Sequence, residues 1–309
     1  MRRKIIKIAN KKNLIKRKVS VVPKRPKIIG HHRKKEPVFF ETGFVVRCKE
    51  FDNKELSQSL INNLKIAIII HVYYDDVIQE ILENYLDNFP FTFDLYIATP
   101  VDSIFNNSKN KDILIKELKQ RNIKFKIITV ENKGKDIGGK LNVIKYINNS
   151  NLNYDYLILA HDKKSPHISS RIGTTWRNVL LKSIFNPRPV QLILKTFKYN
   201  KDVKMCGTRV REGFINSRAI AVNLKNVPYI NKLSSFLIPD IKMSTGAFIG
   251  GTMFWVDCDY MKSKLTTENI DKILYYLEQG DVQEPSIAHG MERMFGLLVT
   301  GNGYKIGKI

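Results

Sequence analysis

Between about residues 64 and 161 the sequence alternates between short apolar runs and segments whose apolar residues recur at helical spacing. Continuous apolar runs are typical of strands buried on both faces of a sheet, and recurrence every three or four residues is typical of helices. The predicted strands are 65–73, 93–99, 124–130 and 154–161, and the predicted helices are 75–89, 111–122 and 138–147. Since this alternation builds right-handed crossover units, we predict an α/β fold with a mostly parallel sheet and helices on both faces.

The rest of the chain is less regular. Its patterns predict helices near 174–198, a strand at 203–208, one long strand at 247–257, and two helical segments between 267 and 299. Apolar residues make up 43% of the chain, which is enough for a substantial core. We therefore expect one domain over residues 61–309.

Residues 1–60 are predicted to form a basic extension that is flexible or loosely attached. The net charge is +23, and the first 50 residues hold 17 Lys or Arg against three Asp or Glu. Such a segment is attracted to polyanions, and the anionic surface of a membrane is a candidate partner. A solvated tail is the alternative. Aromatic residues that would stack on bases are absent from the first 38 positions, which makes a nucleic-acid partner the weaker interpretation.

The apolar runs, such as "IAIII" at 66–70, are much shorter than the roughly 20 residues of a membrane span. No apolar leader segment follows the basic N-terminus. The three cysteines show neither pairing logic nor C-x-x-C spacing, so they favour a reducing compartment. We expect a cytoplasmic protein that is soluble or peripheral to a membrane.

Three polar loops follow predicted strands: "HVYYDD" from residue 71, "ENKGKDIGG" from residue 131 and "HDKKSPH" from residue 161. In open parallel sheets, ligands bind where the carboxyl ends of the strands meet. The loops are therefore expected to lie together and to form a nucleotide-type site.

The segment from Gly134 to Lys140 reads G-x-x-x-x-G-K, which is the beginning of a P-loop. The hydroxyl that would bind magnesium should follow, but position 141 is a leucine. A P-loop hydrolase or kinase therefore remains only an alternative.

The loop "NKGKDIGG" and the strand end "YDYLILAHDKKSPH" resemble the donor half of GT-A glycosyltransferases. Together with "WRNVLL", "GGTMFW" and "AHGMERMFG", they occur in the order seen in the rhamnan synthesis protein F family, over about residues 64–300. The resemblance implies a glycosyltransferase of polysaccharide or surface glycan synthesis. It also implies a dTDP- or UDP-L-rhamnose-like donor and a glycan or lipid-linked glycan acceptor.

The resemblance implies that both loops contact the donor. The residues concerned are His71, Asn132, Gly134, Lys135, Asp136, His161, Asp162, Lys163, Lys164, Ser165 and His167. Lysines can neutralise a diphosphate without a metal, so no metal cofactor is required. Magnesium or manganese remains open, with Asp162 as a candidate ligand. Asp257 and Asp259 form a second D-x-D, but acids before a short helix are more often N-caps.

The sugar or acceptor pocket is expected around the glycine-interrupted strand, since glycine inside a strand often marks the close approach of a ligand. Its predicted residues are Gly251, Thr252, Trp255, Trp176 and Arg177, with Phe254 as a further wall.

His289, Glu292 and Arg293 stand at helical positions i, i+3 and i+4, so they share one face. We interpret Glu292 as the base that accepts the proton of the acceptor hydroxyl, with Glu284 and Asp281 as substitutes. If a β-L-rhamnosyl donor gives an α-linked product, as the resemblance implies, the anomeric centre inverts and one base suffices.

Overall fold

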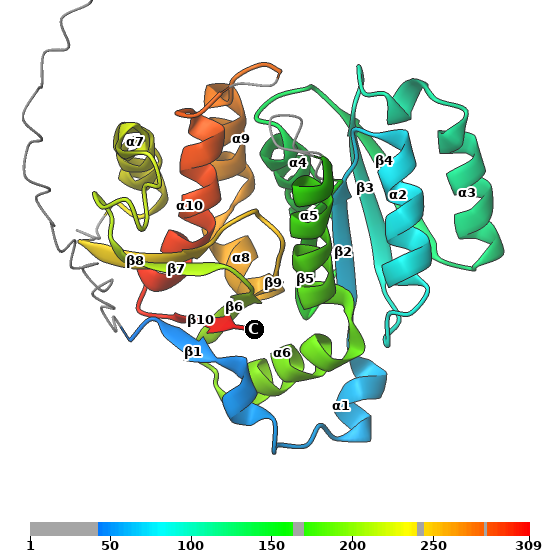
Figure 1. Cartoon of the computed structure of the whole chain (residues 1–309), viewed down its shortest axis with the longest axis horizontal. Coiled ribbons are helices and arrows are strands. Elements are labelled where there is room, and N and C mark those ends of the chain that lie inside the picture. The colour runs from blue at the N-terminus through cyan, green and yellow to red at the C-terminus, as the bar shows by residue number, and fades with distance from the viewer. Residues whose placement is uncertain (1–42, 163–169, 240–243, 281–282) are drawn as a thin grey trace, which may run out of the picture. The chain divides into compact units, whose positions relative to one another are not determined.

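The computed structural model describes residues 43–162, 170–239, 244–280 and 283–309. Eight strands form one sheet in the order β1-β10-β6-β9-β5-β2-β3-β4, and β7 and β8 form a separate antiparallel pair (Figure 1). Every neighbouring pair in the large sheet is parallel except the two pairs that include β9. This confirms the predicted α/β fold with a mostly parallel sheet.

The strands are β1 (Val45–Arg47), β2 (Ile66–His71), β3 (Asp94–Pro100), β4 (Lys124–Val130), β5 (Tyr156–His161), β6 (Val203–Gly207), β7 (Val210–Phe214), β8 (Thr245–Ile249), β9 (Phe254–Asp257) and β10 (Lys305–Lys308). The α-helices are α1 (Gln58–Asn63), α2 (Asp75–Ile81), α3 (Asn110–Gln120), α4 (Asp136–Asn148), α5 (Ser170–Phe185), α6 (Pro187–Tyr199), α7 (Val227–Leu237), α8 (Cys258–Lys264), α9 (Thr267–Tyr276) and α10 (Ile287–Thr300). Short 3-10 helices are η1 (Cys48–Phe51), η3 (Phe105–Asn107) and η4 (Leu224–Asn226), and η2 (Leu82–Leu86) is a π-helical turn that continues α2.

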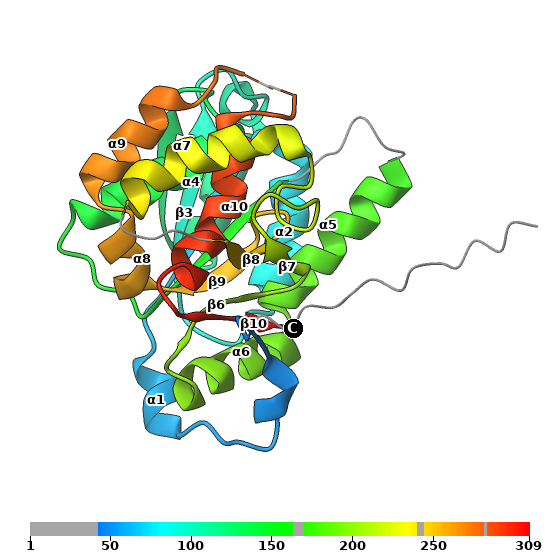
Figure 2. The same cartoon turned by 90° about the vertical axis from the view of Figure 1, so that its left-hand side faces the viewer.

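Strand β2 shows why the sheet carries helices on both faces. All six of its residues are buried, and successive side chains point to opposite faces. Ala67 and Ile69 join a core with α4, α7, α9 and α10, whereas Ile66, Ile68 and Ile70 join a second core with α2, α3, α5 and α6. In Figure 2 the first set of helices lies toward the left, and α5 lies at the right.

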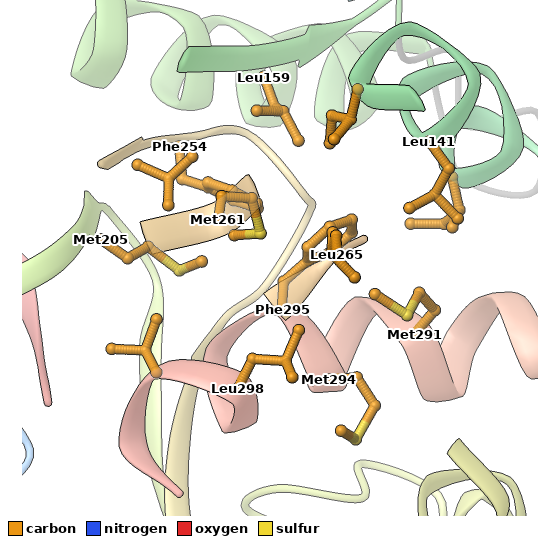
Figure 3. Packing of buried hydrophobic residues seen from close by; sticks show 14 of the residues in the cluster. Leu141, Leu159, Met205, Phe254, Met261, Leu265, Met291, Met294, Phe295 and Leu298 are labelled. Atoms are coloured by element: carbon orange, nitrogen blue, oxygen red, sulfur yellow. The ribbon is translucent and has the colours of Figure 1, made fainter. Parts of the chain in front are cut away.

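Helix α10 is the central helix of the first core. Figure 3 shows Met291, Phe295 and Leu298 pointing from α10 toward side chains of the sheet. The ring of Phe295 meets the ring of Phe254 on β9 edge to face, with centroids 5.4 Å apart. Since α10 also carries Glu292, this packing fixes where the predicted base stands relative to the sheet.

The prediction of a single strand over 247–257 is wrong. The chain forms β8, turns at Gly250–Met253, and then enters the large sheet as β9. Gly251 and Thr252 adopt positive φ angles of 93° and 49°, which a continuous strand cannot contain. The apolar residues on both sides of the turn are buried, so apolarity alone did not separate two strands of different sheets.

The domain boundary predicted at residue 60 also requires correction. Strand β1 pairs in parallel with β10, and the unit that contains the fold begins at Phe40. Residues 43–60 therefore belong to the folded domain, held by pairing with a strand from the other end of the chain. Residues 1–42 of the predicted extension lie outside the described residues.

Helix length bears on membrane insertion. In the described part of the chain, no helix combines the length and the apolarity that crossing a bilayer requires.

The contact between α10 and β8 predicts the effect of a small substitution. A Cβ added at Gly296 would lie 2.4 Å from Phe248 Cα and 2.5 Å from the Ala247 carbonyl oxygen, both backbone atoms. We expect Gly296→Ala to destabilise the protein by about 2 kcal/mol in urea unfolding, although alanine favours helices. Gly290→Ala, whose nearest new contact is a side-chain atom at 3.0 Å, should cost less. Equal or increased stability of Gly296→Ala would contradict the close contact.

Candidate functional site

Three of the predicted donor-site side chains meet at the carboxyl edge of the sheet. His71 ends β2, and His161 ends β5 as its direct neighbour in the ladder. Asp136 begins α4, directly after the loop that follows β4. The Nδ1 atom of His161 lies 3.4 Å from the Asp136 carboxylate. The sheet therefore brings together residues that the sequence placed on separate loops.

A fully buried lysine joins these residues. Lys140 Nζ contacts Asp136 Oδ2 at 2.6 Å, His161 Nδ1 at 3.0 Å and the Thr252 carbonyl oxygen at 2.8 Å. It also lies 3.0 Å from Thr252 Oγ1, which donates in turn to Asp136 at 2.5 Å. Lys140 and Asp136 are four residues apart on one helix face, a spacing that could have identified Lys140, yet it was missing from the predicted site.

The electrostatics of the cluster follow from burial and from these contacts. Burial by itself would raise the pKa of Asp136, but His161, Lys140 and hydrogen bonds from Lys140 and Thr252 hold this pKa well below its ordinary value. Burial lowers the pKa of His71 to about 4, and the Lys140 charge acts in the same direction. His71 is therefore neutral at pH 7, beside an ionised Asp136.

Asp162 has a local structural role. Its Oδ2 accepts hydrogen bonds from the backbone N–H groups of Tyr73 and Tyr74, at 2.6 and 2.5 Å, at the start of α2. Burial raises the pKa of Asp162 to about 8, and the two N–H donors oppose this shift. The side chain therefore fixes the loop after β2 to the end of β5.

The loop that contains Asn132, Gly134 and Lys135 is held by the segment after α9. The N–H of Gly134 donates to the Glu278 carbonyl oxygen at 2.8 Å, and the N–H of Gly280 donates to the Asn132 carbonyl oxygen at 2.7 Å. Gly134 and Lys135 both have positive φ angles, of 62° and 56°. Lys135 is half-buried, and its charge helps to lower the pKa of His289, after the larger effect of burial. The predicted donor loop therefore lies close to α10.

The predicted catalytic residues of α10 form a second network. Arg293 is buried, and its guanidinium contacts Glu292 Oε2 at 2.7 Å and Glu284 Oε1 at 2.8 Å. His289 Nδ1 lies 2.7 Å from the hydroxyl of Ser286, the N-cap of the helix. The remaining oxygen of Glu292 accepts a hydrogen bond of 2.7 Å from the Gly251 N–H.

The turn between β8 and β9 connects the two networks. Gly251 binds Glu292, and the next residue, Thr252, binds Asp136 and Lys140. The predicted base and the predicted donor-loop carboxylate are thus held by adjacent residues. Among the described residues, this is the feature that unites the predicted site.

Three predicted pocket residues have other roles. Trp255 is fully buried in the core, and its indole N–H donates to the Ile184 carbonyl oxygen at 2.8 Å, so its assignment as a pocket wall is wrong. Arg177 is buried and forms an ion pair with Glu80 on α2, so its guanidinium binds within the protein. Phe254, also assigned to a wall, is fully buried against α10.

The predicted residues Lys163, Lys164, Ser165, His167 and Asp281 lie outside the described residues.

Within the described ranges, no three His, Cys, Asp or Glu side chains cluster as a metal site would require. Asp257 caps α8 through the Tyr260 N–H at 2.9 Å and pairs with Lys204, as expected for an N-cap.

The P-loop alternative does not fit the structure. Lys140 is turned into the buried cluster, and Leu141 is fully buried. The glycines of the loop serve close packing: a Cβ at Gly138 would meet the Lys133 carbonyl oxygen at 2.0 Å, and one at Gly139 would meet His71 Nδ1 at 2.2 Å.

The Lys140–Asp136 pair can be tested by a double-mutant cycle. Lys140→Met keeps an unbranched side chain, one heavy atom shorter, but leaves the Asp136 carboxylate without its ammonium partner. We expect a loss of about 2–4 kcal/mol in urea unfolding, because removing one partner of a buried pair leaves the other uncompensated. Adding Asp136→Asn should restore part of it. Strictly additive losses would show that the two groups do not interact.

The buried side chain of His71 should make the unfolding free energy of the protein depend on pH. The folded-state pKa of about 4 lies below the ordinary value near 6.5, so folding excludes a proton from the imidazole. The stability contribution is complete above pH 6.5 and is lost as the pH falls toward 4. Relative to His71→Gln, the wild type should therefore lose unfolding free energy between pH 7 and pH 4.5, measured by urea unfolding. A difference independent of pH would contradict the burial argument.

Comparisons with known proteins show which family this sequence belongs to. The sequence pattern that defines Rhamnan synthesis protein F matches residues 9–304. Two curated relatives, each described as an uncharacterized protein WxcX, come from two strains of Xanthomonas campestris pv. campestris. They are 25% and 26% identical over 243 and 246 residues, which is 78% of this chain in both cases. The chain spans about a third, 32%, of the length of these relatives.

Among solved structures, the crystal structure of S. aureus TarS 1-349 is similar over 75% of this chain and 72% of that one, with 11% identity and a TM-score of 0.33. A likeness at that level carries no argument about function. The family pattern, in contrast, covers nearly the whole sequence, including both networks of the site. This chain belongs to the rhamnan synthesis protein F family.

Proposed function

We propose that this chain is the catalytic domain of an inverting glycosyltransferase of the GT-A type that acts in polysaccharide synthesis. Its donor is a nucleoside diphosphate sugar, L-rhamnose or a related deoxysugar, and its acceptor is a glycan or a lipid-linked glycan. Family membership supports the class of reaction. The observation that carries the proposal is the Gly251–Thr252 turn, which holds Asp136 and Glu292 through adjacent residues.

The reaction needs one proton acceptor. The acceptor hydroxyl oxygen forms a bond to the anomeric carbon, the bond from that carbon to the diphosphate oxygen breaks, and the hydroxyl proton passes to Glu292. Glu292 has 21% of its side chain exposed, and its two oxygens are oriented by the Gly251 N–H and the Arg293 guanidinium. A carboxylate oxygen has further lone pairs beyond these contacts, so it can still accept the proton.

The donor side of the site is formed by the residues around Asp136. Asp136 lies at the N-terminus of α4 with 20% of its side chain exposed, and Lys135 precedes it in a left-handed backbone conformation. We assign the Asn132–Asp136 loop to contacts with the ribose, base or diphosphate of the donor. We assign charge neutralisation to basic side chains, which can balance the charge of a diphosphate without a metal.

Glu292→Gln tests the role of the base. We expect transfer to fall about 100-fold or more, because the amide cannot accept the proton, while donor binding persists. Glu268→Gln is the matched control, since it removes the same charge from an exposed position on α9. Transfer from a panel of dTDP- and UDP-sugars would be measured by product NMR, which also reports the anomeric configuration, and donor binding by saturation-transfer NMR. Full activity of Glu292→Gln would remove this residue from the mechanism.

A further inference from the structure

Two arginines that the sequence did not single out, Arg209 and Arg211, lie beside the turn that holds Glu292. Arg209 is in the connection between β6 and β7, and its carbonyl oxygen accepts a hydrogen bond from the Gly250 N–H at 3.3 Å. The next residue, Gly251, donates to Glu292. Arg211 is the second residue of β7 and pairs with Phe248 on β8. In Figure 1, β7 and β8 cross the lower part of α10, the helix that carries Glu292.

Strand direction places this pair at the same edge as the donor loops. Strand β9 runs antiparallel to both β5 and β6, so β5 and β6 run in the same direction. The carboxyl end of β6, which leads to Arg209, therefore lies at the edge where β2 and β5 end in His71 and His161. Ligands of open α/β sheets bind at that edge.

The orientation of Arg209 is fixed by stacking. Its guanidinium carbon lies 4.5 Å from the centre of the Trp176 ring on α5, within the range of a cation–π contact. The residue adopts a left-handed φ of 54°, a conformation that non-glycine residues rarely take. A strained backbone and an aromatic support hold the charged group at the surface, which is typical of a binding residue.

The charge of the two arginines is only partly balanced. Among the described residues, neither forms an ion pair with an acidic side chain, whereas Arg293 nearby pairs with both Glu284 and Glu292. Burial lowers the pKa of Arg209, and the charge of Arg211 lowers it further, while Glu292 acts in the opposite direction. A doubly charged anion bound between the two guanidinium groups would offset their mutual repulsion.

We propose that Arg209 and Arg211 bind the diphosphate of the nucleotide donor. Guanidinium groups bind phosphate oxygens in a bidentate manner, and Arg209 is already oriented by Trp176. Within the proposed function, on which this assignment rests, the arginines neutralise the charge that develops on the departing diphosphate. Trp176, predicted to line the sugar pocket, then acts as a positioning residue for Arg209.

Binding to the purified full chain tests the assignment. The ligands are UDP, dTDP, inorganic pyrophosphate, uridine and farnesyl diphosphate, measured by calorimetry and saturation-transfer NMR. Arg209→Gln and Arg211→Gln should each weaken UDP or dTDP binding about 10-fold or more, since a charge-assisted contact to phosphate is lost. Arg209→Lys keeps the positive charge but removes the bidentate guanidinium group. Its affinity for UDP or dTDP should therefore lie between those of the wild type and Arg209→Gln. Arg188→Gln is the control, because it removes the same charge from α6, where Arg188 pairs with Asp52.

The outcomes separate the arginine site from the proposed function. Unchanged affinity for nucleoside diphosphates in both glutamine variants, with the wild-type fold retained by circular dichroism, would overturn the arginine site and leave the transferase standing. Arginine-dependent binding of pyrophosphate without binding of any nucleoside diphosphate would keep the anion site and remove the transferase. If the glutamine variants lost binding of farnesyl diphosphate alone, the two arginines would bind a lipid-linked acceptor and not the donor. That result would contradict our assignment.

Discussion

The ammonium group of Lys140 is completely removed from solvent, and the geometry of the candidate site depends on how its charge is compensated. A buried cation costs several kcal/mol unless it is paired and fully hydrogen-bonded. Asp136 supplies the opposite charge, and the carbonyl and hydroxyl oxygens of Thr252 supply further acceptors. His161 Nδ1 lies 3.0 Å from the ammonium group. One side chain therefore fixes the first turn of α4, the end of β5 and the turn before β9 at a single point.

The contacts of Thr252 with Lys140 and Asp136 also affect the position of α10. Thr252 reaches Lys140 and Asp136 from a left-handed conformation, and Gly251 before it also has a positive φ. Strained residues of this kind persist only where the surroundings over-determine them. Because the Gly251 N–H is directed at Glu292 in the same turn, the proposed donor loop and the proposed base share one rigid support. Gly296, packed against the backbone of β8, keeps the helix close enough for that contact.

The basic groups around this support fall into two kinds. Lys140 and Arg293 are buried and paired with carboxylates, so they organise the site. Arg209 and Arg211 are at least partly exposed and have no acidic partner in the described ranges, so their charge remains available. A proton acceptor next to cations that form no ion pair within those ranges would suit the proposed transfer reaction, which releases an anion.

The sequence by itself determined the periodic features of this protein. The apolar run of β2 and the helical spacing of α3 and α4 predicted an α/β sheet, and the polar loops after β2, β4 and β5 predicted the edge where a site would form. Those features are local, since a strand buried on both faces and an amphipathic helix each leave their pattern within a dozen residues.

Only the tertiary structure decided which side chains are buried and what they contact. Lys140 meets Thr252 across 112 positions of sequence. Its spacing from Asp136 could relate the two side chains, but it gives no sign that the lysine is buried. Trp255 was expected to face a sugar, but the pairing of β9 between β5 and β6 encloses it in the core. Burial and charge compensation depend on segments distant in sequence, and these relations leave no periodic pattern for a single sequence to reveal.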